Sequence, residues 1–386
     1  MISPDHGATR PVVTIIYNTC VYVEKFRLPL IAALKEVGYE VIVIAPADEA
    51  TPRLVERGIL HRPITMSQYG MNPLAEIRSV REIHAILREL RPVASLHYTV
   101  KPNTFGNIAA HQAGVPVLNN IAGAGRAFSG GNSLIRKLVM NLYRRGLGKS
   151  HTVFFQNSDD MALFRKAGLV RDSQCARIPG SGVDLTRFKA TPLPEGPVCF
   201  IFVGRLLREK GVSEFLEAAK TLLAEASDPD ALRFDLIGEW ENDKSHISSA
   251  DLKRLTRAPQ ITYQGKVPPA RIDGVMRDTT CVVLPSYYGE GVPRVLLEAC
   301  ASGRPIITTD NVGCRDVVEP GKNGWMVPPR DVGALTDAMR VCAGSRPDEL
   351  AALGAGARRT AETVFDERIV INAYLERLAL IEETSV

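Results

Sequence analysis

The sequence predicts an α/β protein of two doubly wound domains, each a parallel sheet with helices on both faces. Two observations support this fold class. Short β-rich runs alternate along the chain with longer segments whose apolar residues recur every three or four positions. A proline-rich break divides this alternation into two series, and 386 residues are more than one hydrophobic core usually accommodates.

In the first series, five short apolar runs are predicted strands. They lie near Val12–Tyr17, Val41–Ala45, Ala94–His97, Val115–Asn119 and Thr152–Gln156. The segments between them, such as "PLAEIRSVREIHAILREL" and "NTFGNIAAHQAG", have helical apolar spacing. Strands and helices that alternate in this way form a parallel sheet with its helices on both faces.

The second series repeats the pattern with four predicted strands. They are Val198–Val203, Arg233–Ile237, Thr280–Leu284 and Pro305–Thr308. Helical spacing follows in "VSEFLEAAKTLLAEA", "PRVLLEACASG" and "DVGALTDAMRVCAG". Ligands of open α/β sheets bind outside the carboxyl ends of the strands, so motifs that carry chemistry should follow strands directly.

The break between the two series is the segment "KATPLPEGP", residues 189–197. Its prolines and glycine favour a linker. The predicted domains are therefore residues 1–190 and 191–365. Residues 366–386 follow all predicted strands, and their helical stretch "DERIVINAYLERLALIEE" is expected to pack back on the N-terminal domain.

Charge and cysteine content narrow the function classes. A net charge of +4 permits an anionic substrate or a membrane surface but does not indicate a nucleic-acid partner. The seven cysteines include no CxxC spacing, so we expect buried thiols in a reducing compartment and neither disulfides nor a zinc site.

The start "MISPDHGATRP" has no apolar core, and no window holds 18 apolar residues. The expected location is the cytoplasm, either free or peripheral on the inner face of the cell membrane.

The first candidate motif is "FIFVGRLLREKGVSEFLEAA", a strand, a short basic loop and a helix. Gly204 ends the strand, and Arg205 and Lys210 precede the helix that Gly211 opens. Cations beside a helix N-terminus favour a bound phosphate. The alternative is a solvated loop in which Arg205 pairs with a carboxylate. The spacing of a Walker A motif is absent.

The second candidate motif is "VVLPSYYGEGVPRVLLEACASGRPIITT", again strand, loop, helix and strand. Gly291 allows close approach of backbone to a ligand, and Pro293 suits the first turn of a helix. Glu290 lies at the loop tip, and Glu298 lies in the helix, where a carboxylate can accept two vicinal ribose hydroxyls. The alternative is a solvated Glu290 and a Glu298 that only forms a local pair.

These motifs, with "LIGEW" and "ITYQGKVP", are similar to the retaining glycosyltransferases of family 4, and Glu290 and Glu298 match the family's EX7E motif. The strongest similarity covers residues 197–333. It implies the GT-B fold, in which two Rossmann-like domains face each other across a deep cleft. In the first half, "SLHYTVKPNTFGNIAAHQAGVP" and "NNIAGAGRAFSG" resemble the subgroup that acts on polyprenyl-diphosphate-linked saccharides and polysaccharide precursors.

The resemblance implies a donor site in the second half. Its members would be Gly204, Arg205, Lys210, Lys266, Val267, Gly291, Val292, Pro293, Arg294 and Glu298. Arg205 and Lys210 would hold the diphosphate and neutralise the charge that develops on it. Glu298 would bind the ribose, and Glu290 would bind hydroxyls of the donor sugar. The backbone after "YQG", at Lys266 and Val267, would read the base.

The resemblance also implies roles for residues of the first half. His97, directly after a predicted strand, would face the donor sugar and count as catalytic with Glu290, Arg205 and Lys210. Lys101 and Asn103, in the next loop, would bind the acceptor. The loop after the first strand, "NTCVYVEKFRLP", lacks the glycines that many family members have there, which argues against donor-phosphate contacts from it.

The implied activity is transfer of a hexose or N-acetylhexosamine, with retention, from a nucleotide sugar, in first place a UDP sugar. The implied acceptor is lipid-linked or a polysaccharide precursor. No cofactor is expected, and no metal. The "DPD" at Asp228–Asp230 resembles a metal motif of another transferase fold but lies in a polar loop at the wrong end of the sheet. The alternatives are a nucleotide-sugar epimerase of the same fold and a non-catalytic binding protein.

A basic amphipathic segment lies in residues 133–150. Its apolar stripe consists of Leu134, Ile135, Leu138, Val139 and Leu142. The cations around the stripe are Arg136, Lys137, Arg144, Arg145 and Lys149. Such a helix either rests on an anionic membrane surface or packs on the sheet of its own domain with a solvated basic face.

Overall fold

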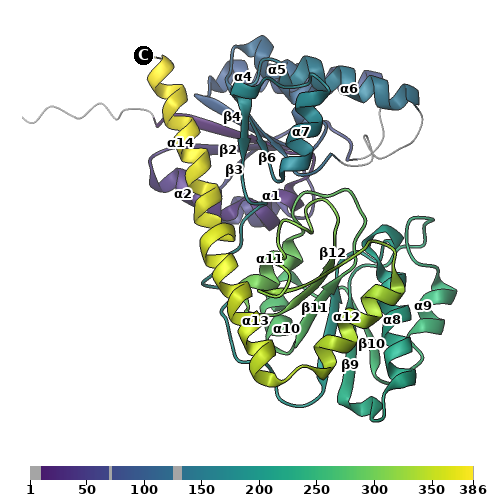
Figure 1. Ribbon diagram of the computed structural model, residues 1–386. Coiled ribbons are helices and arrows are strands. Elements are labelled where there is room, and N and C mark those ends of the chain that lie inside the picture. Colours follow the sequence, from purple (N-terminus) through teal and green to yellow (C-terminus); the bar gives the residue numbers. More distant parts are fainter. Residues whose placement is uncertain (1–9, 69–71, 125–132, 386) are drawn as a thin grey trace, which may run out of the picture. The chain divides into compact units, whose positions relative to one another are not determined.

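The structure is a computed structural model that describes residues 10–68, 72–124 and 133–385. The chain forms two compact units. The first consists of Met1–Ile178 and Val370–Val386, and the second consists of Pro179–Ile369 (Figure 1). No helix of the described residues is long and apolar enough to cross a membrane.

The first unit is built on a seven-stranded parallel sheet of order β3-β2-β1-β4-β5-β6-β7. Its strands are β1 (Val12–Ile16), β2 (Glu40–Ala45), β3 (Leu60–Pro63), β4 (Ala94–Tyr98), β5 (Val117–Ile121), β6 (Thr152–Phe155) and β7 (Cys175–Arg177). Its helices are α1 (Cys20–Phe26), α2 (Leu28–Glu36), α3 (Thr51–Glu56), α4 (Pro73–Leu90), η1 (Pro102–Gly106), α5 (Asn107–Ala113), α6 (Ser133–Leu147), α7 (Ser158–Lys166) and η2 (Asp172–Gln174). The central strands β4 and β5 are buried along their whole length, as parallel strands covered on both faces must be.

The last helix, α14 (Glu367–Ser385), is the long yellow helix of Figure 1. Its residues Val370, Tyr374 and Leu378 belong to the apolar cluster that also contains residues of β1, β2 and β4. The hydroxyl of Tyr374 accepts a hydrogen bond of 3.0 Å from Asn120 Nδ2, and its ring lies 4.6 Å from that of Phe154. The C-terminal end of the chain therefore completes the core of the first unit.

The second unit is built on a six-stranded parallel sheet of order β10-β9-β8-β11-β12-β13. Its strands are β8 (Val198–Val203), β9 (Leu232–Ile237), β10 (Ile261–Gly265), β11 (Cys281–Leu284), β12 (Ile306–Thr309) and β13 (Gly324–Val327). Its helices are η3 (Arg208–Lys210), α8 (Val212–Glu225), η4 (Pro229–Ala231), α9 (Ser249–Leu255), η5 (Pro269–Arg271), α10 (Ile272–Arg277), α11 (Arg294–Ala301), α12 (Val332–Gly344), α13 (Pro347–Thr360) and η6 (Ala361–Phe365). One apolar cluster runs through this unit.

The division between the units falls at Ile178, earlier than the predicted boundary at residue 190. The proline-rich segment lies inside the second unit, because the buried Arg304 uses it as a hydrogen-bond partner. Arg304 Nη1 donates to the carbonyl oxygen of Pro192 at 3.1 Å, and Nη2 contacts Thr191 Oγ1. Proline and glycine show where the chain leaves regular structure, and in this chain the division between the units lies elsewhere.

Four strands were not predicted, and all four are sheet edges. They are β3 and β7 in the first sheet and β10 and β13 in the second. Each is short and has exposed or half-buried positions, and β13, with the sequence GWMV, is the one of the four that is apolar throughout. The predicted central strands are all present, with ends shifted by one or two residues.

Candidate active site

Two loops meet at the carboxyl edge of the second sheet. The basic loop follows β8, and the acidic loop, residues 285–293, follows β11, which is the neighbouring strand. The φ of Gly211 is +79°, and a Cβ there would collide with the carbonyl oxygen of Pro285. The φ of Gly313 is also +79°, and a Cβ there would collide with the carbonyl oxygen of Gly291. Glycine at both positions therefore allows the acidic loop to be held closely on its two sides.

Hydrogen bonds fix the acidic loop in the same place. Tyr287 N donates to the carbonyl oxygen of Glu209 at 2.8 Å, which joins the two loops. On the other side, Asn311 Nδ2 donates to the carbonyl oxygen of Tyr288 at 3.0 Å, and Thr309 Oγ1 donates to that of Ser286. A loop anchored on both sides presents its tip in a defined position.

At that tip, Lys210 and Glu290 form an ion pair across the two loops. Lys210 Nζ lies 2.6 Å from Oε1 and 2.5 Å from Oε2 of Glu290. The two side chains are only 13% and 18% exposed, so this pair is stronger than a fully solvated one. Ser286 Oγ donates to Glu290 Oε1 at 3.3 Å, and the ammonium group lies 5.7 Å from the ring of Tyr288. The structure thus brings one predicted phosphate ligand and one predicted sugar ligand together.

Glu298 lies one turn into α11 and is 12% exposed. Its Oε1 accepts a hydrogen bond of 2.9 Å from Nε of Arg294, the first residue of the helix. Pro293 is the N-cap, and the preceding Val292 is buried against Gly180. The local pair that we considered as an alternative is therefore present, and it holds the carboxylate beside the start of α11.

The other predicted donor residues lie at neighbouring strand ends. Gly204 N donates to the carbonyl oxygen of Ile237, which ties the end of β8 to β9. Arg205 is exposed, and among the described residues its side chain has neither a hydrogen-bond nor an ion-pair partner. Lys266 is exposed and forms an ion pair of 3.0 Å with Glu239, and the next residue, Val267, packs against the apolar cluster. Arg205 is the predicted phosphate ligand that remains unpaired.

In the first unit, His97 does not face an open site, and this corrects the prediction. It is fully buried, and its ring nitrogens have protein partners. Nε2 lies 2.8 Å from Ser95 Oγ, and Nδ1 lies 2.5 Å from Asn107 Oδ1 and 3.1 Å from the carbonyl oxygen of Pro102. Burial lowers the pKa of His97 to about 4, so the ring is neutral at physiological pH. His97 holds the end of β4 to η1 and α5.

The predicted acceptor ligands Lys101 and Asn103 are internal as well. Lys101 Nζ forms an ion pair of 2.6 Å with Glu76, whose side chain is 4% exposed, and it donates to Ser67 Oγ. Asn103 Nδ2 donates to the carbonyl oxygen of Asn120, and its Oδ1 accepts from Asn119. The polar residues of "YTVKPN" therefore hold η1 in place through internal hydrogen bonds and an ion pair. Neither the Lys101 nor the Asn103 side chain is accessible to an acceptor.

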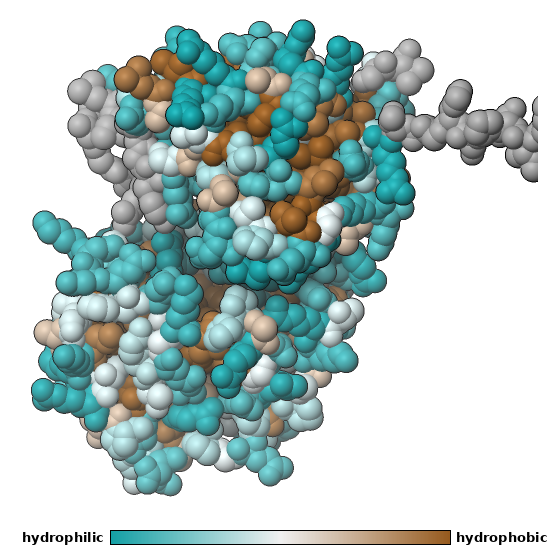
Figure 2. All heavy atoms as spheres, turned by 180° about the vertical axis from the view of Figure 1, so that it is seen from behind, coloured by the Kyte–Doolittle hydropathy of each residue, from teal (hydrophilic) through white to brown (hydrophobic). Residues whose placement is uncertain are grey.

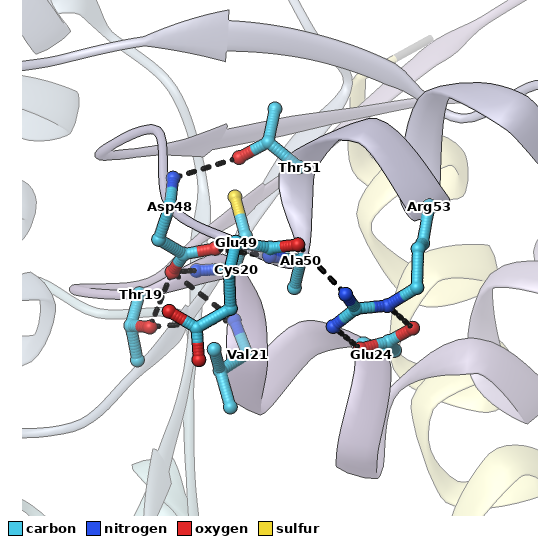
Figure 3. A network of polar contacts seen from close by, with 9 residues as sticks. All are labelled: Thr19, Cys20, Val21, Glu24, Asp48, Glu49, Ala50, Thr51 and Arg53. Carbon is cyan, nitrogen blue, oxygen red and sulfur yellow. Dashed lines mark hydrogen bonds and ion pairs between the residues drawn. The ribbon is translucent and has the colours of Figure 1, made fainter.

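The loop after β1 is closed by a carboxylate from the loop after β2 (Figure 3). Asp48 Oδ2 accepts from Thr19 Oγ1 at 2.5 Å and from Cys20 N at 2.7 Å, and Oδ1 accepts from Ala50 N at 2.9 Å. Burial would raise the pKa of Asp48, but these hydrogen bonds outweigh it and lower the pKa. The N-terminus of α1 is thus occupied by a protein anion, in keeping with the missing glycines.

Two acidic clusters of the second unit bear on the expectation that no metal is needed. Asp228 caps η4 by accepting from Asp230 N, and Asp230 accepts from Gln260, at the amino end of β9. Among the described residues, Glu241, Asp243 and His246 bring one possible ligand atom each within 4.8 Å. The two acids are exposed, and Asp243 already accepts hydrogen bonds from Ser245.

Four residues of this region were not predicted from the sequence. Ser286, Tyr288 and Asn311 shape the acidic loop through the contacts described above. Glu367 is partly buried; burial in the first place, and Asp184 in the second, raise its pKa to about 7, whereas Arg294 acts in the opposite direction. Ser286 could have been found as the polar residue two positions after β11. No local pattern in the sequence links Glu367 with α11.

Two family profiles match the chain. "Glycosyl transferase 4-like domain" matches residues 23–181, and "Glycosyl transferases group 1" matches residues 184–359. The chain is 27% identical over 372 residues to N,N'-diacetylbacillosaminyl-diphospho-undecaprenol alpha-1,3-N-acetylgalactosaminyltransferase of Campylobacter jejuni, with 91% of this chain and 94% of the relative covered. It is 25% identical to UDP-Gal:alpha-D-GlcNAc-diphosphoundecaprenol alpha-1,3-galactosyltransferase of Escherichia coli, with 69% and 70% covered.

Solved structures show the same fold. The Anabaena protein HepE in complex with UDP superimposes with a TM-score of 0.76 at 20% identity, covering 96% of this chain and 99% of that one. Sucrose-phosphate synthase from Thermosynechococcus elongatus gives a TM-score of 0.77 at 18% identity, with 98% and 100% covered. The profiles and the fold agree with the loop geometry, and the chain belongs to the family 4 type of glycosyltransferases with the GT-B fold.

Proposed function

We propose that this glycosyltransferase moves a hexose or N-acetylhexosamine from a UDP sugar to a polyprenyl-diphosphate-linked saccharide, with retention and without a metal. The names of the Campylobacter and Escherichia relatives support this acceptor class, because both contain a diphospho-undecaprenol. UDP is the nucleotide in the HepE complex and in the name of the galactosyltransferase.

The observation that carries the proposal is the contact between Lys210 and Glu290. Cleavage of the donor breaks the bond between the anomeric carbon and the diphosphate oxygen. Positive charge then develops on the sugar and negative charge on the diphosphate. Lys210 and the unpaired Arg205 supply cations for the diphosphate, and Glu290 supplies a hydrogen-bond acceptor for sugar hydroxyls directly beside them. We propose same-face attack by the acceptor hydroxyl, whose proton passes to the leaving phosphate.

A donor screen tests the proposal. Purified protein is incubated with individual UDP and GDP sugars and a synthetic prenyl-diphosphate-linked N-acetylhexosamine in EDTA, and released nucleotide and lipid product are measured. We expect one UDP sugar to give UDP and a product whose new linkage keeps the donor's anomeric configuration. Binding of UDP without product from any donor would favour the non-catalytic alternative. Interconversion of UDP sugars without transfer would favour the epimerase.

The Glu298→Ala variant separates donor binding from chemistry. Glu298 lies beside the start of α11, where the proposal places the ribose. Loss of two hydrogen bonds to hydroxyls should raise the KM for the UDP sugar by about tenfold to a hundredfold. The matched control is Glu319→Ala, because that acid is exposed and forms a surface pair with Lys322. An unchanged KM in Glu298→Ala would remove this residue from the donor site.

The same proposal places the enzyme on the cytoplasmic face of the membrane through α6. Val139 and Tyr143 of this helix are buried in the first unit, so one side of α6 packs inward. The opposite side of the helix faces solvent, where Arg136, Lys137 and Leu138 are exposed. Binding to vesicles with anionic lipid, weakened by salt, is the expected result.

A further inference from the structure

An apolar pocket in the first unit is lined by residues of α4, η1, α5 and α6. Its volume is about 520 Å³, which is within the range of roughly 300–1,000 Å³ that is usual for ligand pockets. The apolar side chains of its lining are Ile77, Val80, Phe105, Ile108, Leu138 and Leu142. Ile77 and Leu138, at its mouth, are 50% and 49% exposed. Figure 2 shows apolar side chains at the surface of this unit in patches bordered by hydrophilic residues.

Cations predominate in the segment of the chain that forms η1, α5 and α6. From Leu90 to Ser158 the chain contains eight Lys and Arg residues and neither Asp nor Glu. Four of these cations belong to α6, which forms one wall, and all four are exposed. An apolar cavity beside exposed cations fits a ligand that has a hydrocarbon chain and an anionic head group.

The one acid of the lining does not alter this charge complementarity. Glu76 is buried, and its carboxylate forms a 2.6 Å ion pair with Lys101, whose side chain is 9% exposed. The pair is electrically neutral as a whole, so the inner wall does not select a cationic ligand. Arg81, which lines the pocket, and the four cations of α6 are all exposed.

We propose that this pocket binds the isoprenoid chain of the prenyl-diphosphate acceptor, while the basic face of α6 attracts its diphosphate. This rests on the proposed function, because only a lipid-linked acceptor brings an isoprenoid chain to the enzyme. The pocket then contributes to acceptor affinity through burial of hydrocarbon, and its effect is independent of the sugar that is transferred.

The test is direct binding of farnesyl diphosphate to the full chain, with inorganic diphosphate as the head-group probe. The test variant is Ile77→Asn with Leu138→Asn, because both side chains are half exposed and a polar residue there is compatible with the fold. The matched control is Val55→Asn with Leu163→Asn, two exposed apolar side chains of α3 and α7, which do not line the pocket. A cooperative thermal unfolding transition of the first unit, at the temperature of the wild type, serves as the folding control for every variant.

We expect farnesyl diphosphate to bind the wild type and the control variant equally, and the pocket variant about tenfold or more weakly. Inorganic diphosphate should not distinguish the three proteins. Equal binding of farnesyl diphosphate by all three, or binding no tighter than that of inorganic diphosphate, would overturn the proposal. So would a pocket variant that loses only its binding to anionic vesicles, because the face would then be a membrane contact.

The two proposals fail in different ways. If the wild type turns over no donor, the proposed function is wrong, and farnesyl diphosphate binding still decides whether the pocket takes a prenyl chain. If donors are turned over and the pocket variant binds farnesyl diphosphate normally, only the pocket assignment is wrong.

Discussion

The two units carry polar residues at the same place in their folds and use them differently. In the second unit, Lys210 and Glu290 follow neighbouring strands and meet each other at a loop tip. In the first unit, His97 is the last residue but one of the central strand β4, and its ring is enclosed by Ser95 and Asn107. The ion pair of the second unit lies at a loop tip, where it can contact a ligand. The hydrogen bonds of His97 in the first unit satisfy buried polar groups.

The difference shows which sequence signals carry function. The acidic loop combines glycines, a helix start and two acids, and the basic loop independently supplies cations. His97 was a single residue whose position after a strand suited a catalytic role and a structural role equally well. Its environment comes from Asn107 and Pro102, which lie on the elements that follow β4. Several coinciding features identified a site, and one residue in a suitable place did not.

The largest effect is expected at the contact between the loops. Lys210→Ala removes a cation from the developing charge of the diphosphate, and kcat should fall by about a hundredfold to a thousandfold. The control is Lys266→Ala, since Lys266 is an exposed lysine whose expected donor contact is through its backbone. Activity of Lys210→Ala within about twofold of the wild type would refute the assignment of this pair.

A second prediction concerns stability in the first unit. His97→Ala removes a buried ring together with its hydrogen bonds, and should lower the free energy of unfolding by about 3 kcal/mol. The turnover per folded molecule should stay near that of the wild type. Denaturant titration followed by assay of the folded fraction measures both. A large loss of kcat in a fully folded variant would restore the catalytic role that the structure removes.

The same histidine predicts a pH dependence. Its pKa is about 4 in the native protein, below the ordinary value of 6.5, so the unfolded chain binds its proton first as the pH falls. The stability that the neutral ring provides is therefore complete above pH 6.5 and is lost progressively between pH 6.5 and 4, by up to about 3 kcal/mol. The slope of unfolding free energy against pH should be shallower for His97→Ala. Parallel slopes would show that His97 is not buried in its neutral form.

A smaller effect is expected at Asp48, which closes the N-terminus of α1. Asp48→Ala removes an acceptor for several donors and should cost about 1–2 kcal/mol of stability. The KM for the UDP sugar should not change, because the loop already has an internal anion. A weaker donor affinity at an unchanged folded fraction would instead indicate that this loop takes part in binding.

The smallest expected effect is that of metal removal. EDTA should leave kcat and KM unchanged, since the proposed charge neutralisation uses Arg205 and Lys210. If EDTA lowers the rate and added Mg²⁺ restores it, the Asp243→Asn variant tests where the metal ion binds. Loss of the metal effect in that variant would assign the ion to the cluster of Glu241, Asp243 and His246.

Much of the fold could be predicted from the sequence because central parallel strands are continuous apolar runs. Edge strands such as "LHRP" and "CAR" are half exposed, so only their pairing with a neighbouring strand identifies them. The boundary was placed too late because the proline-rich segment satisfies Arg304 of its own unit. In the site, the acidic loop was recognisable from its local pattern, whereas the burial of His97 and Lys101 depends on partners such as Asn107 and Glu76.

The most direct test of the account compares Lys210→Ala with His97→Ala in one assay of UDP release, normalised to folded protein. In the proposed mechanism, the loops of the second unit stabilise the charge of donor cleavage and His97 has a structural role only. It predicts a loss of about a hundredfold or more for Lys210→Ala and a change within about threefold for His97→Ala. A rate near that of the wild type for Lys210→Ala, with a collapse for folded His97→Ala, would contradict it.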